Sequence, residues 1–217
     1  MLKHYSPPLD PYLDILYRDK HLLVLNKQSG LLSVPGKHED HKDCVEARAV
    51  EAFPTAMTVH RLDMETSGVL VMALDRETHR HIGKQFERRK TSKTYIARLH
   101  GTLEKDEGSI DLPLICDWPN RPKQMVDHIA GKEALTHYKV LERERTATRV
   151  EFTPITGRSH QLRVHALALG HPILGDNLYG SDEVIAAAPR LQLHALRLTL
   201  FHRVRKESMT FEAPLPF

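Results

Sequence analysis

The nine residues HRLDMETSG, residues 60–68, form a short polar turn that runs directly into the apolar segment VLVMAL, residues 69–74. Because residues 69–74 are apolar throughout, they are predicted to form a strand that is buried on both faces. Asp63 therefore has cations beside it in the turn and hydrophobic chain behind it. Carboxylates in such surroundings serve as nucleophiles or as general acids and bases. The stretch predicts a buried strand and a candidate catalytic residue.

The segments around this stretch predict the class of the fold. Runs of apolar and β-branched residues predict strands at 21–26, 94–99, 134–141, 149–154, 193–201 and 209–211. Helices are predicted at 44–53, at 76–90 after an Asp75 N-cap, and from a Ser159 N-cap to about Leu169. Strands outnumber helices and do not alternate strictly with them. This favours an α+β fold with a mixed, mainly antiparallel central sheet flanked by helices.

Length and composition limit the class of protein. The chain has 217 residues, of which 41% are hydrophobic, so it can bury a core and is not globally disordered. It contains no repeat or linker, and we expect a single domain over residues 1–217. Cys44 and Cys116 belong to no CxxC pattern, which fits a reducing compartment. The N-terminus has no signal-peptide pattern, and residues 69–74 are too short to span a bilayer. We expect a soluble, cytoplasmic protein.

Positive charge is concentrated in one part of the chain. Residues 76–98 contain eight basic and two acidic residues, a local excess of six that exceeds the whole-chain net charge of +3. A concentrated cationic surface indicates a polyanionic partner. A solvated helix face is the alternative interpretation.

A second group of candidate functional residues lies in TGRSHQLRVH, residues 156–165. Arg158, His160 and Arg163 surround the start of a predicted helix, where the backbone already carries partial positive charge. Cations at this position cost stability unless an anion lies among them. That anion could be a phosphate, the carboxylate of Asp63, or both. Alternatively, the three side chains simply point to solvent.

Tyr95 begins a predicted strand within KTYIA, residues 93–97. Its ring could stack on a base and its hydroxyl could transfer a proton, although a half-buried strand tyrosine is the commoner case. The 15 histidines match no standard metal-ligand spacing, and the chain has no Walker A, G-x-G-x-x-G or G-x-S-x-G motif. The sequence therefore predicts no metal and no cofactor.

Four motifs, taken together, resemble the signature of the RluA-type pseudouridine synthases. They are HRLDMETSG (60–68), SKTYIA (92–97), GRSHQLRVHALALGHPILGD (157–176), and DILYRD with LNKQSGL (14–19 and 25–31). Their order and spacing agree with the family over nearly the whole chain, and residues 111–123 resemble a dual-specificity branch that acts on 23S rRNA and tRNA. The family usually has Lys-Pro-x-Gly where this chain has KQSG at 27–30, so the rigidity of that loop is in question.

The resemblance implies a fold, a reaction and a set of catalytic residues. The fold would be the pseudouridine synthase catalytic fold, with a cleft at the centre of its sheet. Asp63 would be the catalytic nucleophile or base in a reaction that breaks the N1–C1′ bond of a uridine and rejoins the uracil through C5. Arg163 would pair with Asp63, Tyr95 would stack on the target base, and Leu162 would contact the base. The reaction needs no cofactor.

The resemblance also implies how RNA is held. The target uridine must leave its stack, and Arg61 would fill the vacated space. His60, Arg158 and His160 are further candidates for RNA contacts. The chain leaves no room before Tyr12 for an S4-type RNA-binding domain, so the catalytic domain would hold tRNA and 23S rRNA alone, as a monomer. A non-catalytic RNA-binding protein and a glycosylase that releases free uracil are the alternatives.

Overall fold

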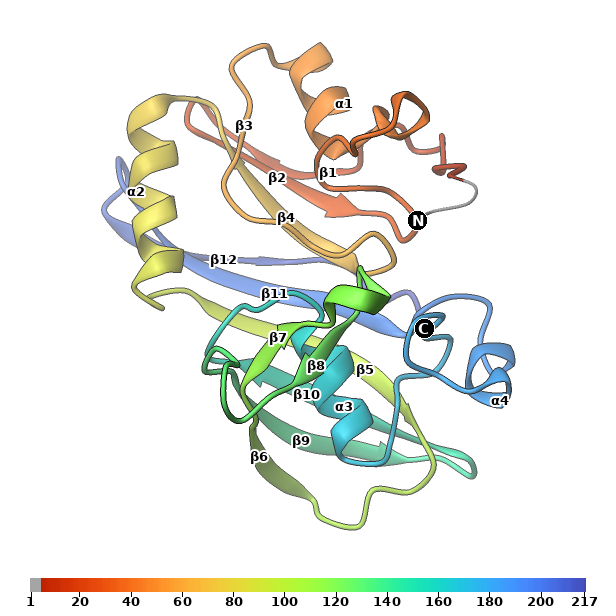
Figure 1. Ribbon diagram of the computed structural model, residues 1–217. Coiled ribbons are helices and arrows are strands. Elements are labelled where there is room, and N and C mark those ends of the chain that lie inside the picture. The colour runs from red at the N-terminus through yellow and green to blue at the C-terminus, as the bar shows by residue number, and fades with distance from the viewer. Residues whose placement is uncertain (1–4) are drawn as a thin grey trace. The chain divides into compact units, whose positions relative to one another are not determined.

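The computed structural model describes residues 5–217, and contacts between these residues divide the chain into two compact units. We call residues 5–93 and 195–216 the Asp63 unit, and residues 94–194 with Phe217 the Arg163 unit. Figure 1 traces both units by residue number. Residues 1–4 lie outside the described residues, and the single domain expected over residues 1–217 stays a prediction.

The strands of the Asp63 unit surround the segment with which the sequence analysis began. In sheet order they are β1 (Ile15–Arg18), β2 (Leu22–Lys27), β4 (Ser67–Ala73) and β11 (Leu193–His202), which belongs to this unit from Ala195 onward. Two further strands, β3 (Met57–Thr58) and β12 (Glu207–Glu212), pair with β4 and β11. The pairs β1–β2, β2–β4, β3–β4 and β11–β12 are antiparallel. All seven residues of β4 are buried, and five of them belong to the predicted buried strand at 69–74, whereas Leu74 lies beyond β4 and is half-buried.

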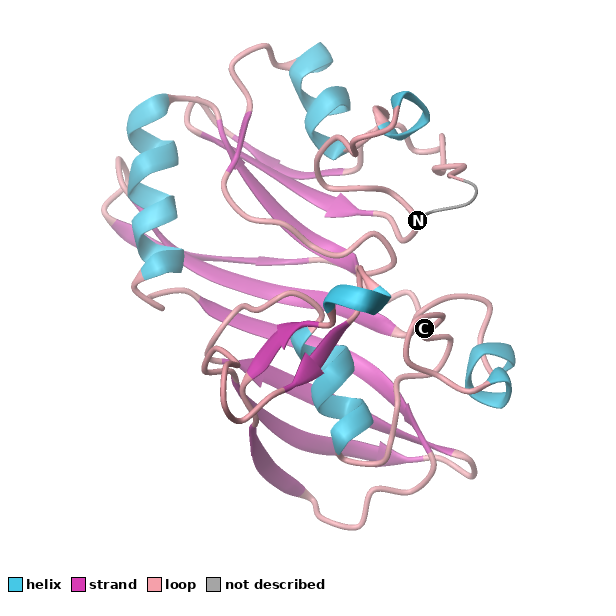
Figure 2. Ribbon diagram, viewed as in Figure 1, coloured by secondary structure: helices cyan, strands magenta, loops and turns pink. Residues whose placement is uncertain are grey.

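Two α-helices of this unit begin where the sequence predicted them. In α1 (Val45–Ala52), the Cys44 sulfur accepts a hydrogen bond from Ala47 N. In α2 (Arg76–Glu87), a carboxylate oxygen of Asp75 accepts one from Thr78 N at 2.8 Å. Ile82 of α2 is buried in the core that β2, β4, β11 and β12 line. Figure 2 shows these helices beside the strands, and a short 3-10 helix, η1 (Glu39–His41), completes the unit.

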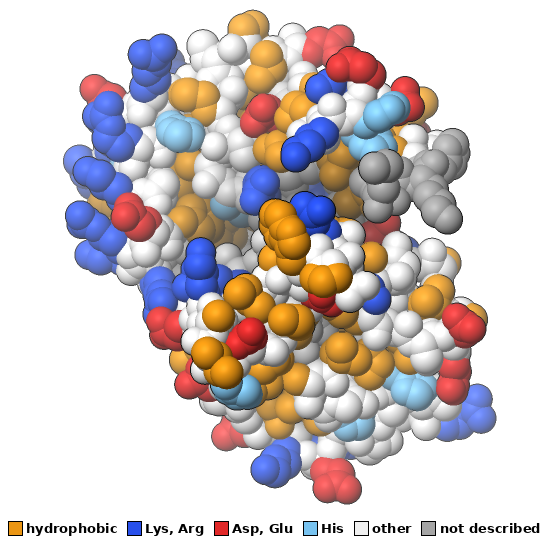
Figure 3. Space-filling model, viewed as in Figure 1, with side chains coloured by type: hydrophobic (Ala, Val, Ile, Leu, Met, Phe, Trp, Pro, Cys, Tyr) orange, Lys and Arg blue, Asp and Glu red, His pale blue; other side chains and the backbone are white. Residues whose placement is uncertain are grey.

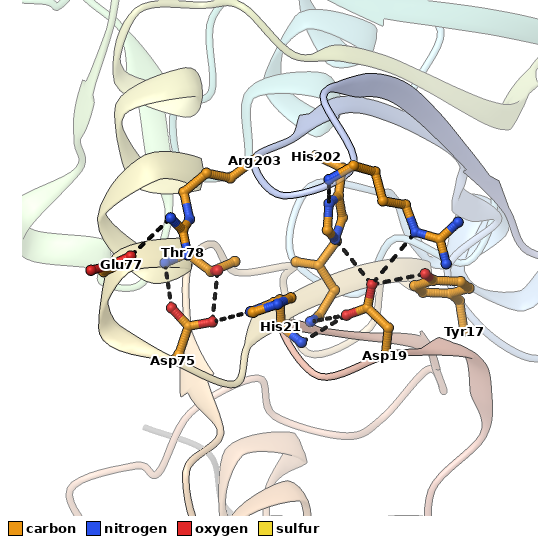
Figure 4. A network of polar contacts seen from close by, with 10 residues as sticks. Tyr17, Asp19, His21, Asp75, Glu77, Thr78, His202 and Arg203 are labelled. Carbon is orange, nitrogen blue, oxygen red and sulfur yellow. Dashed lines mark hydrogen bonds and ion pairs between the residues drawn. The ribbon is translucent and has the colours of Figure 1, made fainter.

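A polar network fixes the start of α2 (Figure 4). Besides Thr78 N, the Asp75 carboxylate binds the Thr78 hydroxyl at 2.8 Å and His21 Nδ1 at 2.7 Å. Burial alone would raise the pKa of Asp75, but these hydrogen bonds outweigh it and hold that pKa at about 2. Nearby, Asp19 lies 3.0 Å from His202 Nε2. The network thus joins the β1–β2 turn and the end of β11 to the helix that carries the basic residues.

The Arg163 unit has its own antiparallel strands. In order they are β5 (Ser92–His100), β10 (Ala147–Pro154), β9 (Leu135–Arg143) and β6 (Glu107–Asp111). A separate hairpin pairs β7 (Leu114–Cys116) with β8 (Gln124–Val126) around the short η2 (Trp118–Asn120). The helices are α3 (Gln161–Ala168) and the short α4 (Asp182–Ala186). Phe152 of β10 is fully buried in the core of this unit.

The α+β class and the mainly antiparallel strand pairing are confirmed, but one cap is wrong. The residue before α3 is His160, in the left-handed region at φ 53°, and not Ser159. Among the residues that the structure describes, no side chain caps α3. Instead Gln161 Oε1 accepts hydrogen bonds from the Thr156 hydroxyl at 2.7 Å and from Arg158 N at 2.9 Å. The hydrogen bonds at the start of α3 are therefore made by the buried Gln161 within the helix, and not by the serine N-cap that local sequence rules favour.

Candidate active site

The turn that carries Asp63 is clamped by the chain that follows β2. The Lys27 ammonium donates to the carbonyl oxygen of Met64 at 2.8 Å, and Gly30 N donates to the same oxygen at 2.9 Å. Ser33 donates its hydroxyl to Leu62 O at 2.6 Å and accepts from Leu62 N at 3.1 Å. The backbone on both sides of Asp63 is therefore fixed by hydrogen bonds from residues 27–33.

Lys27 itself is buried, with 2% of its surface exposed. Besides Met64 O, its ammonium donates to Gln28 O at 2.8 Å and to Leu31 O at 2.5 Å. A buried ammonium is tolerated only with such acceptors. The Lys27 contacts, together with Gly30 in the left-handed region at φ 84°, hold the KQSG loop, which lacks the proline usual in the family.

Gly68 ends the turn at a place where no side chain fits. Its φ is 111°, and a Cβ there would lie 2.2 Å from Ala195 O on β11. A glycine is needed at this close approach of two backbones. Asp63 is half-buried just before this point, and Arg61 is exposed.

His60 lies against the strand that follows the turn. Its ring stacks on Phe86 of α2 at a centroid distance of 4.6 Å, and its Nε2 accepts a hydrogen bond from Val71 N at 3.0 Å. Because Nε2 is an acceptor, it carries no proton. Burial, and to a smaller extent the nearby Lys93 ammonium, lowers the pKa of His60 to about 4. His60 is therefore a neutral ring that supports β4, and at neutral pH it offers RNA no charge.

The basic residues of α2 face solvent in one stripe. Three of them and the C-cap residue are exposed and spaced four residues apart: Arg76, Arg80, Lys84 and Arg88. Figure 3 shows Lys and Arg side chains gathered over this helix at the left of the view. Nearby Lys93 is half-buried, and burial together with the charge of Arg89 lowers its pKa to about 8. This stripe is the cationic surface that the local charge excess predicted.

In the Arg163 unit, Arg163 is buried with 2% of its surface exposed and binds Asp176. Its Nε lies 2.9 Å from one carboxylate oxygen of Asp176 and a terminal nitrogen lies 2.5 Å from the other. Asp176 is completely buried and also accepts backbone hydrogen bonds from Leu178 N and Tyr179 N. Asp176 is therefore one anion that lies beside Arg163 in α3, and the pairing of Arg163 with Asp63 stays a prediction.

The other predicted residues of this unit lie around the start of α3 or on β5. Arg158 is exposed and donates from Nε to Glu133 O at 2.9 Å. Leu162 is buried in the core of the unit. Tyr95 is a half-buried strand residue opposite Phe152 of β10.

Tyr179 connects the start of α3 to the β7–β8 hairpin. Its hydroxyl accepts a hydrogen bond from Gln124 N at 2.8 Å and lies 2.7 Å from His160 Nδ1. The Arg163 guanidinium lies over its ring at 5.3 Å from the centroid. One side chain therefore contacts two predicted site residues and the hairpin.

The structure describes no candidate metal centre. Among residues 5–217, no three His, Cys, Asp or Glu side chains converge as metal ligands would. No helix in that range is long and apolar enough to cross a membrane.

Comparison with known proteins shows the family of the chain. The model of a family described as RNA pseudouridylate synthase matches residues 21–168. The chain belongs to the RNA pseudouridylate synthase family. The resemblance read from the four motifs is thereby confirmed, and the chain is an RNA-modifying isomerase.

Individual relatives match over nearly their whole lengths. The Dual-specificity RNA pseudouridine synthase RluA of Escherichia coli K12 is 56% identical over 217 residues, covering 100% of this chain and 99% of the relative. The protein of the same name from Haemophilus influenzae is 51% identical over equal shares. The structure of Human RNA Pseudouridylate Synthase Domain Containing 1 has a TM-score of 0.81 and 30% identity, covering 98% of this chain and 87% of that one. These matches confirm the pseudouridine synthase fold.

Four residues that shape the site were not predicted: Lys27, Ser33, Asp176 and Tyr179. Two of them carried a signal, because Lys27 and Asp176 stand inside motifs that resemble the family. A role for each would have required knowing which chain segments meet in the fold.

Proposed function

We propose that this protein is a dual-specificity RNA pseudouridine synthase that isomerises uridines in the anticodon stem-loop of tRNA and in 23S rRNA. The observation that carries the proposal is the full-length similarity, at 56% identity, to an enzyme whose name states dual specificity. The resemblance of residues 111–123 to the branch that acts on 23S rRNA and tRNA supplies the two RNA classes.

Asp63 is the catalytic carboxylate in this proposal. The N1–C1′ bond breaks, the uracil turns, and a C5–C1′ bond forms. The hydrogen on C5 leaves to solvent while N1 gains a proton, so the atoms balance and no cofactor is consumed. The hydrogen bonds from Lys27 and Ser33 to the backbone beside Asp63 support this role, because a catalytic group must be held in place before the substrate arrives.

The other predicted residues have supporting roles. Tyr95 stacks on the target base, Arg163 favours the ionised form of the catalytic carboxylate, and Leu162 contributes to the apolar surroundings of the base.

RNA is held by residues of the two motifs at 60–68 and 156–165 and by the helix α2. Arg61 is exposed and fills the space that the target base vacates. Arg158 and His160 contact phosphates at the start of α3, and His60 supports the turn as a neutral ring. The exposed stripe on α2 adds phosphate contacts that give affinity more than sequence choice.

We further propose a monomeric protein that works in the cytoplasm. Both cysteines, Cys44 and Cys116, are free thiols, and this supports a reducing compartment.

The experiment that tests the function is release of tritium from C5-labelled uridine in tRNA and 23S rRNA transcripts, with the mass of the RNA measured in parallel. We expect wild type to release tritium from both transcripts without a change of mass, and Asp63→Asn to release none while still binding RNA. Glu65→Gln, in the same turn, is the matched control and should stay active.

Each other outcome contradicts a part of the proposal. Release of free uracil would identify a glycosylase. Tight binding without tritium release by wild type would identify a non-catalytic RNA-binding protein. Turnover by Asp63→Asn would remove Asp63 from the reaction.

A further inference from the structure

The β7–β8 hairpin packs on α3 by one face only. Leu114 and Val126 form a cross-strand pair on the inner face, and they cluster with Val164 of α3. The next cross-strand pair, Ile115 and Met125, lies on the outer face. In Figure 1 the hairpin and α3 are drawn together within the Arg163 unit. The inner face therefore packs the hairpin on α3, whereas Met125 on the other face is exposed.

Two large apolar side chains of the hairpin are exposed. Trp118, the one tryptophan of the chain, is 67% exposed, and Met125 of β8 is 42% exposed. Exposed apolar side chains on one short element indicate an interaction surface. With most of its surface in solvent, Trp118 contributes little to the packing of the described part of its unit.

Trp118 is in contact with a cation. The Arg121 guanidinium lies over the indole at 4.1 Å from the ring centroid, and its Nε donates to Trp118 O at 3.1 Å. The turn is closed by hydrogen bonds from Asp117 N to Lys123 O at 3.0 Å and from Asn120 N to Asp117 O at 3.0 Å. The ring and its guanidinium are therefore presented by a fixed turn.

The charges of the hairpin favour a base over a phosphate as the group that binds there. Arg121 and Lys123 are balanced by Asp117 and Asp127, so the surface has no net positive charge with which to attract a phosphate backbone. A flat aromatic ring stacked with a planar guanidinium matches the π-face of a nucleobase. A base can stack there whatever its identity, because every base has such a face.

The hairpin is continuous with residues proposed to contact RNA. Gln124 N of β8 donates to the Tyr179 hydroxyl, which in turn lies 2.7 Å from His160 Nδ1 at the start of α3. A base on Trp118 would thus be bound by the same unit that holds nearby phosphates at Arg158 and His160.

We propose that Trp118 and Arg121 form a stacking platform for an unpaired nucleobase of the RNA substrate, separate from the target uridine. This inference rests on the proposed function, because it assumes that the substrate is a structured RNA with unpaired bases.

Because the chain contains one tryptophan, its fluorescence reports on this platform alone. We expect the tRNA and 23S rRNA transcripts to quench Trp118 fluorescence saturably. Trp118→Ala should raise Kd by roughly 5- to 150-fold without changing its salt dependence. Trp118→Phe, which keeps a ring, should lose less. Ile129→Ala, which removes an exposed apolar side chain beyond the end of β8, is the control that should bind normally.

The outcomes separate the platform from the function. If wild type forms pseudouridine while Trp118 is not quenched and Trp118→Ala and Trp118→Phe both bind normally, the platform is refuted and the enzyme stands. A loss for Trp118→Ala that comes with a reduced salt slope would refute stacking in favour of a phosphate contact. If Ile129→Ala weakens RNA binding as much as Trp118→Ala, the loss does not depend on the aromatic ring, and stacking on Trp118 is refuted. If wild type neither binds these RNAs nor releases tritium, the proposed function fails and the platform fails with it.

Discussion

The neutral state of His60 predicts a measurable loss of stability on acidification. Its pKa lies at about 4 in the folded protein, whereas an exposed histidine has a pKa of 6.5. Below pH 6.5 the unfolded chain therefore binds a proton that folded His60 does not, so stability is lost as the pH falls from 6.5 toward 4. This difference contributes almost nothing at pH 7.5 and removes about 2 kcal/mol at pH 5.

The variant that isolates this effect is His60→Gln. Glutamine can still accept the hydrogen bond from Val71 N but does not titrate. The stability advantage of wild type over His60→Gln, measured by urea unfolding, should be about 2 kcal/mol smaller at pH 5 than at pH 7.5. The other histidines are present in both proteins, so their contributions cancel.

A second variant separates the charge of His60 from its hydrogen bond. His60→Phe keeps the stacking surface against Phe86 but leaves Val71 N without its acceptor, so it should cost about 1–3 kcal/mol more than His60→Gln at both pH values. If the advantage of wild type is equal at pH 5 and pH 7.5, His60 is not held neutral and the reasoning is refuted.

Three further predictions follow from buried charges and from the stripe on α2. Arg163→Ala and Asp176→Asn should each destabilise the protein by about 3–5 kcal/mol, and the double variant by less than the sum; additive losses in a double-mutant cycle would show that the pair is not coupled. Lys27→Met should lower the free energy of unfolding in urea by about 3 kcal/mol, and the folded variant should turn over more slowly. The exposed control Lys20→Met should change neither quantity. Equal behaviour of the two variants would refute the role of Lys27 in fixing the Asp63 turn. Replacing the exposed stripe by glutamine should lower the salt slope of RNA binding by about three, since each phosphate contact contributes roughly 0.7–0.9, and an unchanged slope would leave the stripe merely solvated. The four positions are Arg76, Arg80, Lys84 and Arg88.

The parts of the fold that were predicted correctly are those that local sequence determines. The apolar run that became β4 and the Asp75 cap of α2 are specified by neighbours within a few residues. The strands β7 and β8 have three residues each, and no pattern that short is distinctive. They are stabilised by the packing of Leu114 and Val126 against Val164 of α3, a contact that forms only in the folded chain. The left-handed His160 was missed for the same reason, because its conformation is imposed by the surrounding loop.

In the candidate site, too, the residues that were not predicted are those whose partners are distant in the sequence. The sequence predicted that an anion must lie among Arg158, His160 and Arg163, and it left open whether that anion was a phosphate, the Asp63 carboxylate, or both. Asp176 lies thirteen residues further on, after a loop whose path no local rule predicts, and it holds Arg163 by both oxygens. Lys27 was overlooked because a lysine in a turn is normally exposed. Its burial depends on three carbonyl groups that converge only when residues 27–31 meet the Asp63 turn.

Two of the buried cations, Lys27 and Arg163, are explained by the same physical argument. Taking a charge out of water costs several kcal/mol, and apolar residues of similar size would often serve stability as well or better. Each of these cations nevertheless stands in a motif of the family, and each is bound to a group beside or on a predicted catalytic residue. Lys27 fixes the turn of Asp63, and Arg163 is itself held by Asp176, which also ties down the loop at Tyr179. We infer that these charges are retained for geometry, because a directional ammonium or guanidinium fixes the position of its acceptors in a way that an apolar contact does not.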